Sequence, residues 1–433
     1  MTDCWHIRGG RIIDPSTGRD EIGDVWIAGG TIVPPGSVPA RALDAIGCVV
    51  VPGLVDLHVH LREPGGEESE TVESGAAAAA AGGFSAIVAM PNTHPPTDTP
   101  DRVAWLLHRG EACRGARVLP SACITMGRNG RSLADLRKLA AAGAVAFTDD
   151  GSTVLDEELM RQAMQIAREL GVTVMDHALD HTMAPGGSMH EGEWSKRWGV
   201  PGIPSRAESA VVARDVRLAE ETGCRVHIQH VSARESLDLI RAARARGLPV
   251  SAEVTPHHLT LTDADVDGRN TAFKVSPPLR SAGDREALIE AVIDGTVQAF
   301  ATDHAPHSAG SKAKPFAEAP FGLIGLETAV GVTWTALVAS GRMAVPEWVR
   351  RWTVGPALVL GLPVPRLTPG AAADVTIIDP EVEWTVRSEA FLSRSRNTPF
   401  EGWRLRGRPV CTLCRGTLLW RAPSCRDAVD RGA

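Results

Sequence analysis

Eight alternations of an apolar strand segment with a helical segment run from residue 49 to about residue 340, and this repeat restricts the possible fold more than any other feature of the chain. Eight such units over about 300 residues predict an α/β fold of the TIM type, a (β/α)8 barrel. A doubly wound open sheet shows the same alternation but usually has fewer units. The predicted strands end near His60, Asn92, Thr125, Asp150, His177, Val231, His257 and His304.

The segments between these strands have the apolar spacing of amphipathic helices. Glycine follows many of them, as expected after a helix C-terminus. Two long connections, Asp180–Ser205 and Leu259–Pro278, are predicted to be active-site loops. The predicted helices are Glu70–Ala81, Asp101–Cys113, Ser132–Ala142, Glu157–Leu170, Arg206–Thr222, Ala233–Arg246, Asp284–Ile293 and Ile324–Ser340, and the capping glycines are Gly82, Gly143, Gly171, Gly223, Gly247 and Gly341.

Both ends of the chain have a different pattern, with short β-favouring segments separated by glycine turns. HIRGGRIID and DVWIAGGTIV near the start each contain Gly-Gly, which indicates hairpins. Short β-favouring segments occur again near the end, in ADVTIID, EWTVRS and WRLRGRPVCTLCRGTLLW. We therefore predict a small β-sandwich domain built from residues 1–55 and 366–433, with the barrel, residues 56–365, inserted between them.

The net charge of −7 and the pI near 6.1 argue against nucleic acid or an anionic membrane as the main partner. We expect no signal peptide, because MTDCWHIRGG lacks a basic and an apolar region, and no stretch is long and apolar enough to span a bilayer. The eight cysteines are scattered, and Cys411 and Cys414 are interpreted as strand residues. Scattered reduced thiols indicate a cytoplasmic protein.

Potential metal ligands follow the predicted strands, at the barrel end where such folds place their chemistry. His58 and His60 are two residues apart in an extended segment, so both rings lie on one face. Four histidines and two carboxylates without a thiolate suit zinc or a similar divalent ion. The full set is His58, His60, Asp150, His177, His230 and Asp303.

Six ligands exceed the needs of one tetrahedral zinc but suit two ions that share an anionic bridge. We assign the bridge to Asp150, since no lysine ends the fourth strand. A water on such a centre has its pKa lowered to roughly 7 and supplies hydroxide to attack a polarised carbonyl. Asp303 is placed to take the proton and pass it to a leaving nitrogen.

Three further side chains near the same mouth, Arg62, Asn92 and His307, are candidates for holding a substrate carboxylate. The alternative for Arg62 is a surface ion pair with Glu63 or Glu67.

Other polar residues receive structural interpretations. Asp149 is predicted to be a turn residue, and His227 to be packed on the face opposite His230. The pair His257-His258 fits either loop structure or active-site lining.

With this set of residues the chain resembles the cyclic amidohydrolases, and most closely the bacterial class I dihydroorotases. The resemblance runs nearly end to end through PGLVDLHVHLREPG, AMPNT, AFTDDG, HEGEWSKRWGVPGIPSRAES, EVTPHHL, SPPLR, FATDHAPH and NTPFEGW. It implies reversible ring closure of N-carbamoyl-L-aspartate to L-dihydroorotate, the third step of pyrimidine synthesis. It also implies a homodimer, sometimes in complex with aspartate transcarbamoylase.

The resemblance implies roles residue by residue. His58, His60 and Asp303 match the ligands of a first zinc ion, and His177 and His230 those of a second. Asp150 matches the bridge, and Asp303 also the acid/base group. Arg62, Asn92 and His307 match contacts to the substrate carboxylate.

The chain departs from the family pattern at two places. His-Cys-Glu of the family reads His177-Ala178-Leu179 here, and the family's substrate-binding Asn is Ser276. These departures leave two alternatives open: a hydantoinase- or allantoinase-type enzyme, or an inactive partner of aspartate transcarbamoylase. Arg62 and Asn92 argue against the first, and the complete ligand set argues against the second.

Overall fold

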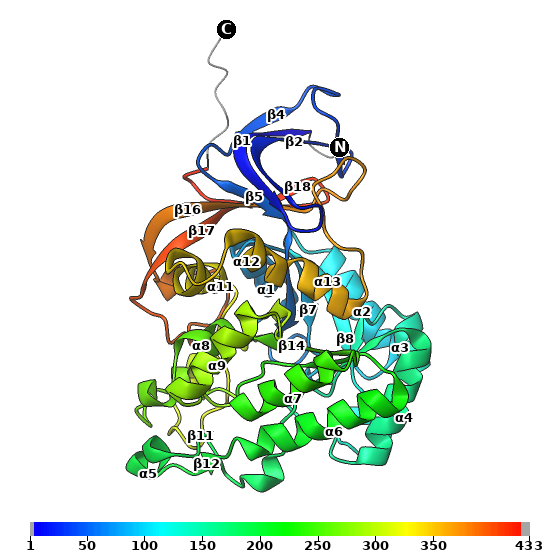
Figure 1. Cartoon of the computed structure of the whole chain (residues 1–433), viewed down its shortest axis with the longest axis vertical. Coiled ribbons are helices and arrows are strands. Elements are labelled where there is room, and N and C mark those ends of the chain that lie inside the picture. The colour runs from blue at the N-terminus through cyan, green and yellow to red at the C-terminus, as the bar shows by residue number, and fades with distance from the viewer. Residues whose placement is uncertain (1–3, 426–433) are drawn as a thin grey trace.

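The computed structural model describes residues 4–425, and its largest element is a barrel of eight parallel strands surrounded by helices (Figure 1). The strands are hydrogen-bonded in chain order, and a parallel bridge between Val59 and His304 joins the last to the first. The predicted (β/α)8 barrel is confirmed. Its strands are β6 (Leu54–Val59), β7 (Phe84–Ala89), β8 (Arg117–Ala122), β9 (Ala146–Phe147), β10 (Thr173–Asp176), β13 (Val226–Ile228), β14 (Val250–Val254) and β15 (Ala299–Phe300).

The predicted helices are present, with ends that differ by a few residues in most cases. The largest differences are at 132–142, where the helix begins only after the Asp135 cap, and at 324–340. In the second case Gly325 and Leu326 donate backbone hydrogen bonds to His304 Nδ1, so the helix starts later. The helices are α1 (Val72–Ala81), α2 (Pro100–Glu111), α3 (Leu136–Ala141), α4 (Glu157–Leu170), α6 (Arg206–Thr222), α7 (Arg234–Ala245), α9 (Ala282–Ile293) and α11 (Ala329–Thr333), which continues as a π-helix, η5 (Trp334–Ala339).

One predicted capping glycine has a different role. Gly82 has right-handed backbone angles, and the next residue, Gly83, adopts the left-handed conformation with φ +95°. A Cβ on Gly82 would lie 2.2 Å from the Leu326 carbonyl oxygen. Glycine is therefore needed at position 82 for close packing of two chain segments.

Two helices that were not predicted, α12 (Val345–Trp352) and α13 (Val354–Leu360), cover the N-terminal end of the barrel. The Trp352 ring packs against Phe84 and Phe300, with 5.2 Å between ring centroids in both pairs. Val359 accepts a hydrogen bond from Thr173, the first residue of β10. These contacts close the end of the barrel opposite the predicted site.

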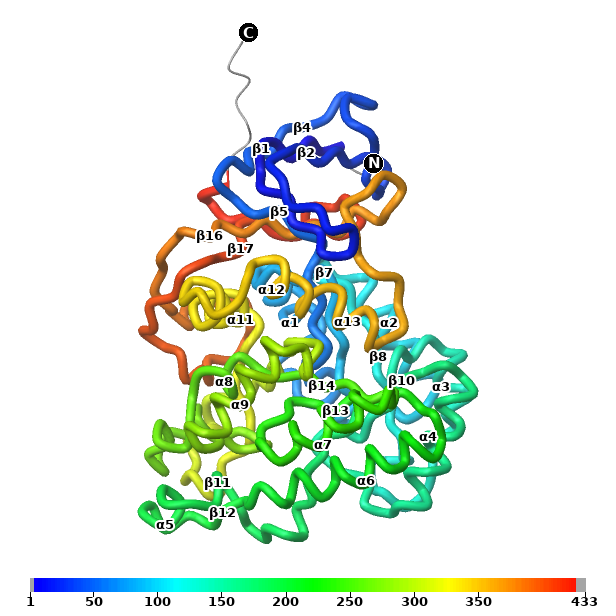
Figure 2. Tube along the Cα trace, viewed as in Figure 1, coloured from blue at the N-terminus to red at the C-terminus, as the bar shows by residue number. Residues whose placement is uncertain are grey.

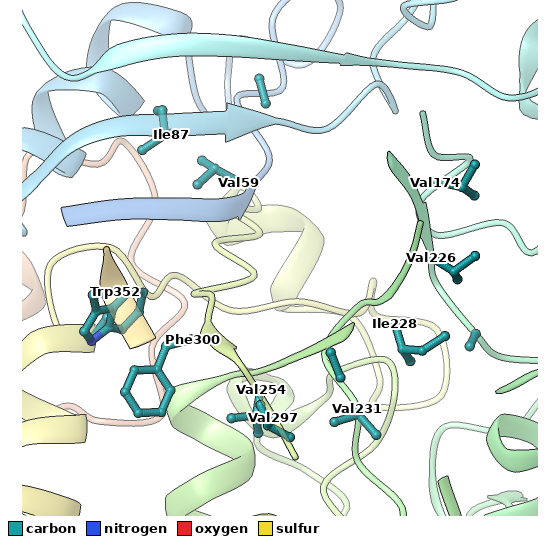
Figure 3. Close-up of a cluster of buried hydrophobic side chains, with 14 of the residues drawn as sticks. Val59, Ile87, Val174, Val226, Ile228, Val231, Val254, Val297, Phe300 and Trp352 are labelled. Carbon is teal, nitrogen blue, oxygen red and sulfur yellow. The ribbon is translucent and has the colours of Figure 1, made fainter. Parts of the chain in front are cut away.

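The barrel core consists of apolar side chains from successive strands and from the helices around them. Figure 3 shows Val174, Val226 and Ile228 on neighbouring strands, all without exposed surface. Complete burial of an aliphatic side chain contributes about 1.5–3 kcal/mol. The core therefore fixes the strand ends that carry the polar residues.

The two ends of the chain together form a small β-domain. Figure 2 shows the first and last segments side by side. β5 pairs in parallel with β1 and antiparallel with β16, so a single eight-stranded sheet unites both ends. The limits 1–55, 56–365 and 366–433 stay a prediction, and residues 1–3 and 426–433 lie outside the described part. The strands are β1 (Trp5–Asp14), β2 (Arg19–Ala28), β3 (Thr31–Val33), β4 (Arg41–Asp44), β5 (Val49–Pro52), β16 (Val375–Thr385), β17 (Arg404–Cys414) and β18 (Thr417–Arg421).

The two Gly-Gly signals have different outcomes. Gly29-Gly30 forms the predicted hairpin turn between β2 and β3. Gly9-Gly10 does not, since β1 continues through it with a register shift against β2. Gly9 has φ +67° and donates its N–H to Asp24, as in a β-bulge. The first hairpin prediction was wrong because glycine serves bulges as well as turns.

The two long connections contain secondary structure of their own. In residues 4–425 no helix combines the length and apolarity needed to cross a membrane. The remaining elements, in these connections and elsewhere, are η1 (Met126–Arg128), η2 (His181–Met183), β11 (Met189–His190), α5 (Glu193–Trp198), β12 (Gly202–Ile203), α8 (Pro256–Thr260), η3 (Asp263–Asp265), η4 (Thr271–Phe273), α10 (Ala309–Lys312) and η6 (Ser388–Ala390).

Candidate metal centre and active site

The six predicted ligands meet at the C-terminal end of the barrel. His58 lies within β6, and the other five follow barrel strands by one to three residues. None of the six is more than 7% exposed. Their burial has a physical cause, because parallel strands covered by helices have no solvent-facing side.

One group of ligands is formed by His58, His60 and Asp150. The Asp150 oxygens lie 3.2 Å from His58 Nε2 and 3.5 Å from His60 Nε2. Asp303 joins this group, with Oδ1 3.1 Å from His60 Nε2 and 3.6 Å from His58 Nε2. Two imidazoles and two carboxylates thus face one another, a donor set that suits a divalent cation.

A second group is formed by Asp150, His177 and His230. His177 Nδ1 and His230 Nε2 lie 2.9 Å apart, and they are 3.7 and 3.8 Å from Asp150 Oδ1. Asp150 is the residue that both groups share. This is the position that a carboxylate bridging two ions must occupy.

The hydrogen bonding of the site suits a bound cation. Within residues 4–425, His58 Nε2 and Asp150 Oδ1 are buried and make no hydrogen bond. Leaving such groups unpaired costs free energy, and buried polar groups are nearly always satisfied. Since His58 Nδ1 donates to Glu253, Nε2 is the nitrogen that is directed at Asp150. A cation between these atoms would satisfy both.

The electrostatics of the site favour positive charge. Burial opposes protonation of His58, but Asp150 and Asp303 outweigh it and raise its pKa well above the usual value. Burial also opposes ionisation of Asp303, yet the charges and hydrogen bonds of His58 and His60 lower its pKa. Burial lowers the pKa of His177 to about 4, which leaves its imidazole neutral, as a metal ligand must be.

Two further side chains orient the first histidines. His58 Nδ1 donates to Glu253 Oε1 at 2.8 Å, and His60 Nδ1 donates to Asn92 Oδ1 at 2.8 Å. Each bond directs Nε2 of its imidazole into the site, as outer partners of metal-binding histidines do. The predicted substrate residue Asn92 therefore also positions His60.

A hydrogen-bonded relay continues from Glu253 through the barrel core. Glu253 Oε2 lies 3.1 Å from His227 Nε2, and His227 Nδ1 lies 2.9 Å from Ser251 Oγ. His227 and Glu253 are completely buried. His227 is thus a packed residue outside the two ligand groups, as predicted, and it supports the acceptor of His58.

Backbone strain is concentrated at the site. Arg62, His230 and Asp303 have φ values of +59°, +30° and +46°, in the left-handed region that side chains disfavour. Arg128, with φ +55°, donates to the Asp150 carbonyl. Such conformations cost of order 1–3 kcal/mol each and persist where surrounding contacts hold them, often at functional sites.

A cavity of about 360 Å³ opens beside the two ligand groups. Arg62, Asn92, Ser276 and His307 line it together with the ligands other than His58. Arg62 donates from Nε to the Pro306 carbonyl, so it is not the surface ion pair considered as an alternative. The structure therefore brings every predicted substrate residue to one cavity.

Two polar side chains of the cavity wall are His307 and Ser276. Burial, with the nearby charge of Arg62, lowers the pKa of His307 to about 3, so this imidazole is neutral. Its Nε2 donates to the Phe321 carbonyl at 2.7 Å. Ser276 Oγ is buried without a hydrogen-bond partner among the described residues.

Sequence reasoning missed His181, which also lines the cavity. It follows His177 by four residues, in a loop that the sequence marked only by its length. The His177 and His181 rings stack with 6.0 Å between centroids.

Several residues near the site are structural. Asp149 accepts hydrogen bonds from the backbone N–H groups of Ile124 and Thr125, as expected of a loop carboxylate. His258 Nε2 donates to the Pro277 carbonyl and so supports the loop of Ser276. His257 and His258 are buried but are not among the residues lining the cavity.

The departures at Ala178 and Leu179 lie outside the cavity wall. Both side chains are buried, and Leu179 packs with Ala184, Ile203 and Ala207. These positions therefore affect packing of the following loop. Ser276 is the departure that faces the cavity.

Comparisons with known proteins agree with this geometry. A family model described as Dihydro-orotase-like matches residues 47–236. The chain is 49% identical over 420 residues to Dihydroorotase of Pelotomaculum thermopropionicum, covering 95% of this chain and 97% of that protein. It is 48% identical over 378 residues to Dihydroorotase of Geobacillus thermodenitrificans, covering 87% and 88%.

Solved structures give the same architecture. L-Hydantoinase (dihydropyrimidinase) from Arthrobacter aurescens matches with a TM-score of 0.86 and 27% identity, covering 96% of each chain. Its lower identity separates it from the relatives above, which share nearly half of their residues with this chain along most of its length. The chain belongs to the dihydroorotase family.

Proposed function

We propose that the chain is a zinc-dependent dihydroorotase, which catalyses reversible cyclisation of N-carbamoyl-L-aspartate to L-dihydroorotate and water. One observation carries this proposal: two ligand groups share Asp150, and Arg62 lines the same cavity. The shared carboxylate suits a hydrolytic centre with two ions. The arginine suits a substrate that bears a carboxylate on its ring.

The ligand set divides between two zinc ions per subunit. His58, His60 and Asp303 would hold the first, His177 and His230 the second, and Asp150 both. When bound, the ions would polarise the ring amide carbonyl and lower the pKa of the attacking water.

Asp303 is the proton carrier of the reaction. In the hydrolytic direction its carboxylate takes a proton from the attacking water and delivers it to the ring nitrogen as the carbon–nitrogen bond breaks. In the direction of ring closure the same carboxyl group moves the proton back. Its position 3.1 Å from His60 Nε2 keeps it ionised and directed at the centre.

The substrate is oriented by four side chains of the cavity wall. Arg62 supplies charge to the ring carboxylate, while Asn92 and His307 supply hydrogen bonds. Ser276 Oγ is unpaired and is placed to bond a polar group of the ring.

The proposal extends to assembly and location. A homodimer and association with aspartate transcarbamoylase follow from the family resemblance. No disulfide joins any of the eight cysteines in the described part of the chain, which supports a cytoplasmic enzyme.

The decisive experiment is turnover by the zinc-loaded protein, measured in both directions with N-carbamoyl-L-aspartate and L-dihydroorotate. Hydantoin, dihydrouracil and allantoin serve as competing substrates. We expect reversible turnover of the first pair and little of the others. A zinc-loaded protein that prefers a ring without a carboxylate would contradict the proposal, and zinc absent from both sites would indicate an inactive partner.

A further inference from the structure

A second cavity, of about 330 Å³, lies at the opposite end of the barrel. It is lined by residues at the N-terminal ends of β13 and β14 and by helices α12 and α13. The metal ligands follow the C-terminal ends of the barrel strands, so the two cavities lie on opposite faces. Small-molecule pockets usually measure about 300–1,000 Å³, and this cavity falls within that range.

Four arginines line this cavity: Arg225, Arg244, Arg350 and Arg351. Arg225 donates to neutral oxygens, the Thr173 hydroxyl and a backbone carbonyl. Arg244 likewise donates to a backbone carbonyl. Neither guanidinium group forms an ion pair with a carboxylate of the described chain.

The other two arginines share one carboxylate. Glu347 lies 3.5 Å from Arg350 Nε and 3.6 Å from Arg351 Nη1. Within the described part of the chain, no other carboxylate forms an ion pair with any of the four guanidinium groups. Three positive charges therefore remain unbalanced by contact.

Arg351 is the buried arginine of the four, and the excess of positive charge affects its pKa. Burial lowers the pKa of Arg351, and the charges of Arg350 and Arg244 lower it further against the opposing effects of Glu347 and Asp294. Like charges held together at a partly buried site are costly unless an anion joins them. The cavity is therefore poised to accept negative charge.

Apart from Ser251 and Gln298, the remaining side chains of the wall are apolar. Leu248, Val354 and Leu358 line it, and Leu358 is 62% exposed. A large exposed leucine beside arginines suits a ligand with an apolar part and a charged part. We propose that this cavity binds a small organic phosphate carrying at least two negative charges and one apolar group. The inference is independent of the reaction at the other end of the barrel.

Calorimetric titration of the zinc-loaded protein tests this directly, with adenosine 5′-diphosphate and inorganic pyrophosphate as probes. We expect both to bind with Kd below ~1 mM and more weakly at higher salt. Arg244→Gln should weaken binding about tenfold or more, because a hydrogen bond between two charged groups is lost. The exposed position of Leu358 makes Leu358→Glu a second variant, expected to weaken binding by repulsion without loss of the fold.

Two controls separate this site from others. Arg246→Gln removes the same charge on the same helix end, but Arg246 pairs with Glu220 and is outside the cavity wall, so binding should not change. Arg62→Met removes a cation from the metal-side cavity and should also leave binding unchanged. Loss of binding in Arg62→Met with retention in Arg244→Gln, or no binding by wild-type protein, would overturn the proposal.

Discussion

Replacement of Glu253 by glutamine should weaken zinc binding without touching a ligand. Glu253 is completely buried and accepts from His58 Nδ1 at 2.8 Å, from His227 Nε2 at 3.1 Å and from the His230 N–H at 3.3 Å. Although burial opposes ionisation, hydrogen bonds from His227 and His58 lower the pKa of Glu253 to about 2. It is therefore a full negative charge behind His58.

Glutamine keeps the shape of the side chain and removes this charge. His227 can adapt by exchanging its tautomer, because Ser251 Oγ can donate as well as accept. The remaining effect is on His58, whose imidazole becomes a weaker ligand. Outer partners of this kind contribute about 10–100-fold to metal affinity, which corresponds to about 1.4–2.7 kcal/mol.

The assay is competition for zinc between the protein and a chromogenic chelator, at fixed pH, with thermal unfolding of the metal-free protein measured beside it. Glu208→Gln is the matched control, since Glu208 is also buried and accepts from the Ser232 and Ala233 N–H groups without contacting a candidate ligand. It should destabilise the fold but leave zinc affinity unchanged. Equal zinc affinity in Glu253→Gln and wild-type protein would refute the reasoning.

Four other outcomes follow from the structure. Asp303→Asn should keep the fold, measured by circular dichroism, and lose nearly all turnover, so full activity would remove Asp303 from its role. Arg62→Met should raise KM far more than it lowers kcat, and an unchanged KM would exclude the carboxylate contact. Removal of metal by a chelator should abolish turnover, and added zinc should restore it; activity that survives complete metal removal would contradict a metal-dependent reaction. Burial and the nearby charge of Lys274 lower the pKa of Lys312 from 10.5 to about 7; between these values the unfolded chain binds a proton that the folded chain has released, so stability should rise with pH across this window. Thermal unfolding of Lys312→Met should lack this rise, and an identical pH profile would contradict the assignment.

Much of the site was predictable because the constraints are local. His58 and His60 are two residues apart, and strand geometry alone places them on one face. The remaining predicted ligands follow apolar strands, whose carboxyl ends must meet in a barrel. Position at the barrel mouth made Arg62, Asn92 and His307 candidates for holding a carboxylate, and the family resemblance matched the same roles.

What the sequence did not reveal depends on contacts between distant segments. Glu253 lies in VSAEV and has no local mark of a histidine partner 195 residues earlier. A signal was available, because a carboxylate in a buried parallel strand needs a partner. No comparable feature of the sequence marks His181 or Arg128. Both lie in loops, and the course of each loop places the side chain at the site. The same limit explains Gly9-Gly10, where pairing with β2 decided between a bulge and a turn.

The relay from His58 through Glu253 and His227 to Ser251 makes the two ends of the barrel interdependent. Ser251 belongs to the wall of the second cavity, whereas His58 belongs to the metal centre. An engineer who alters the closed end of this barrel, for example to graft a new binding site there, would also change the last hydrogen bond of the chain that supports His58, a candidate metal ligand. In barrels of this type the active site lies at one end, and the residues of the other end mainly stabilise the fold. In this chain a substitution at the second end can also affect the active site.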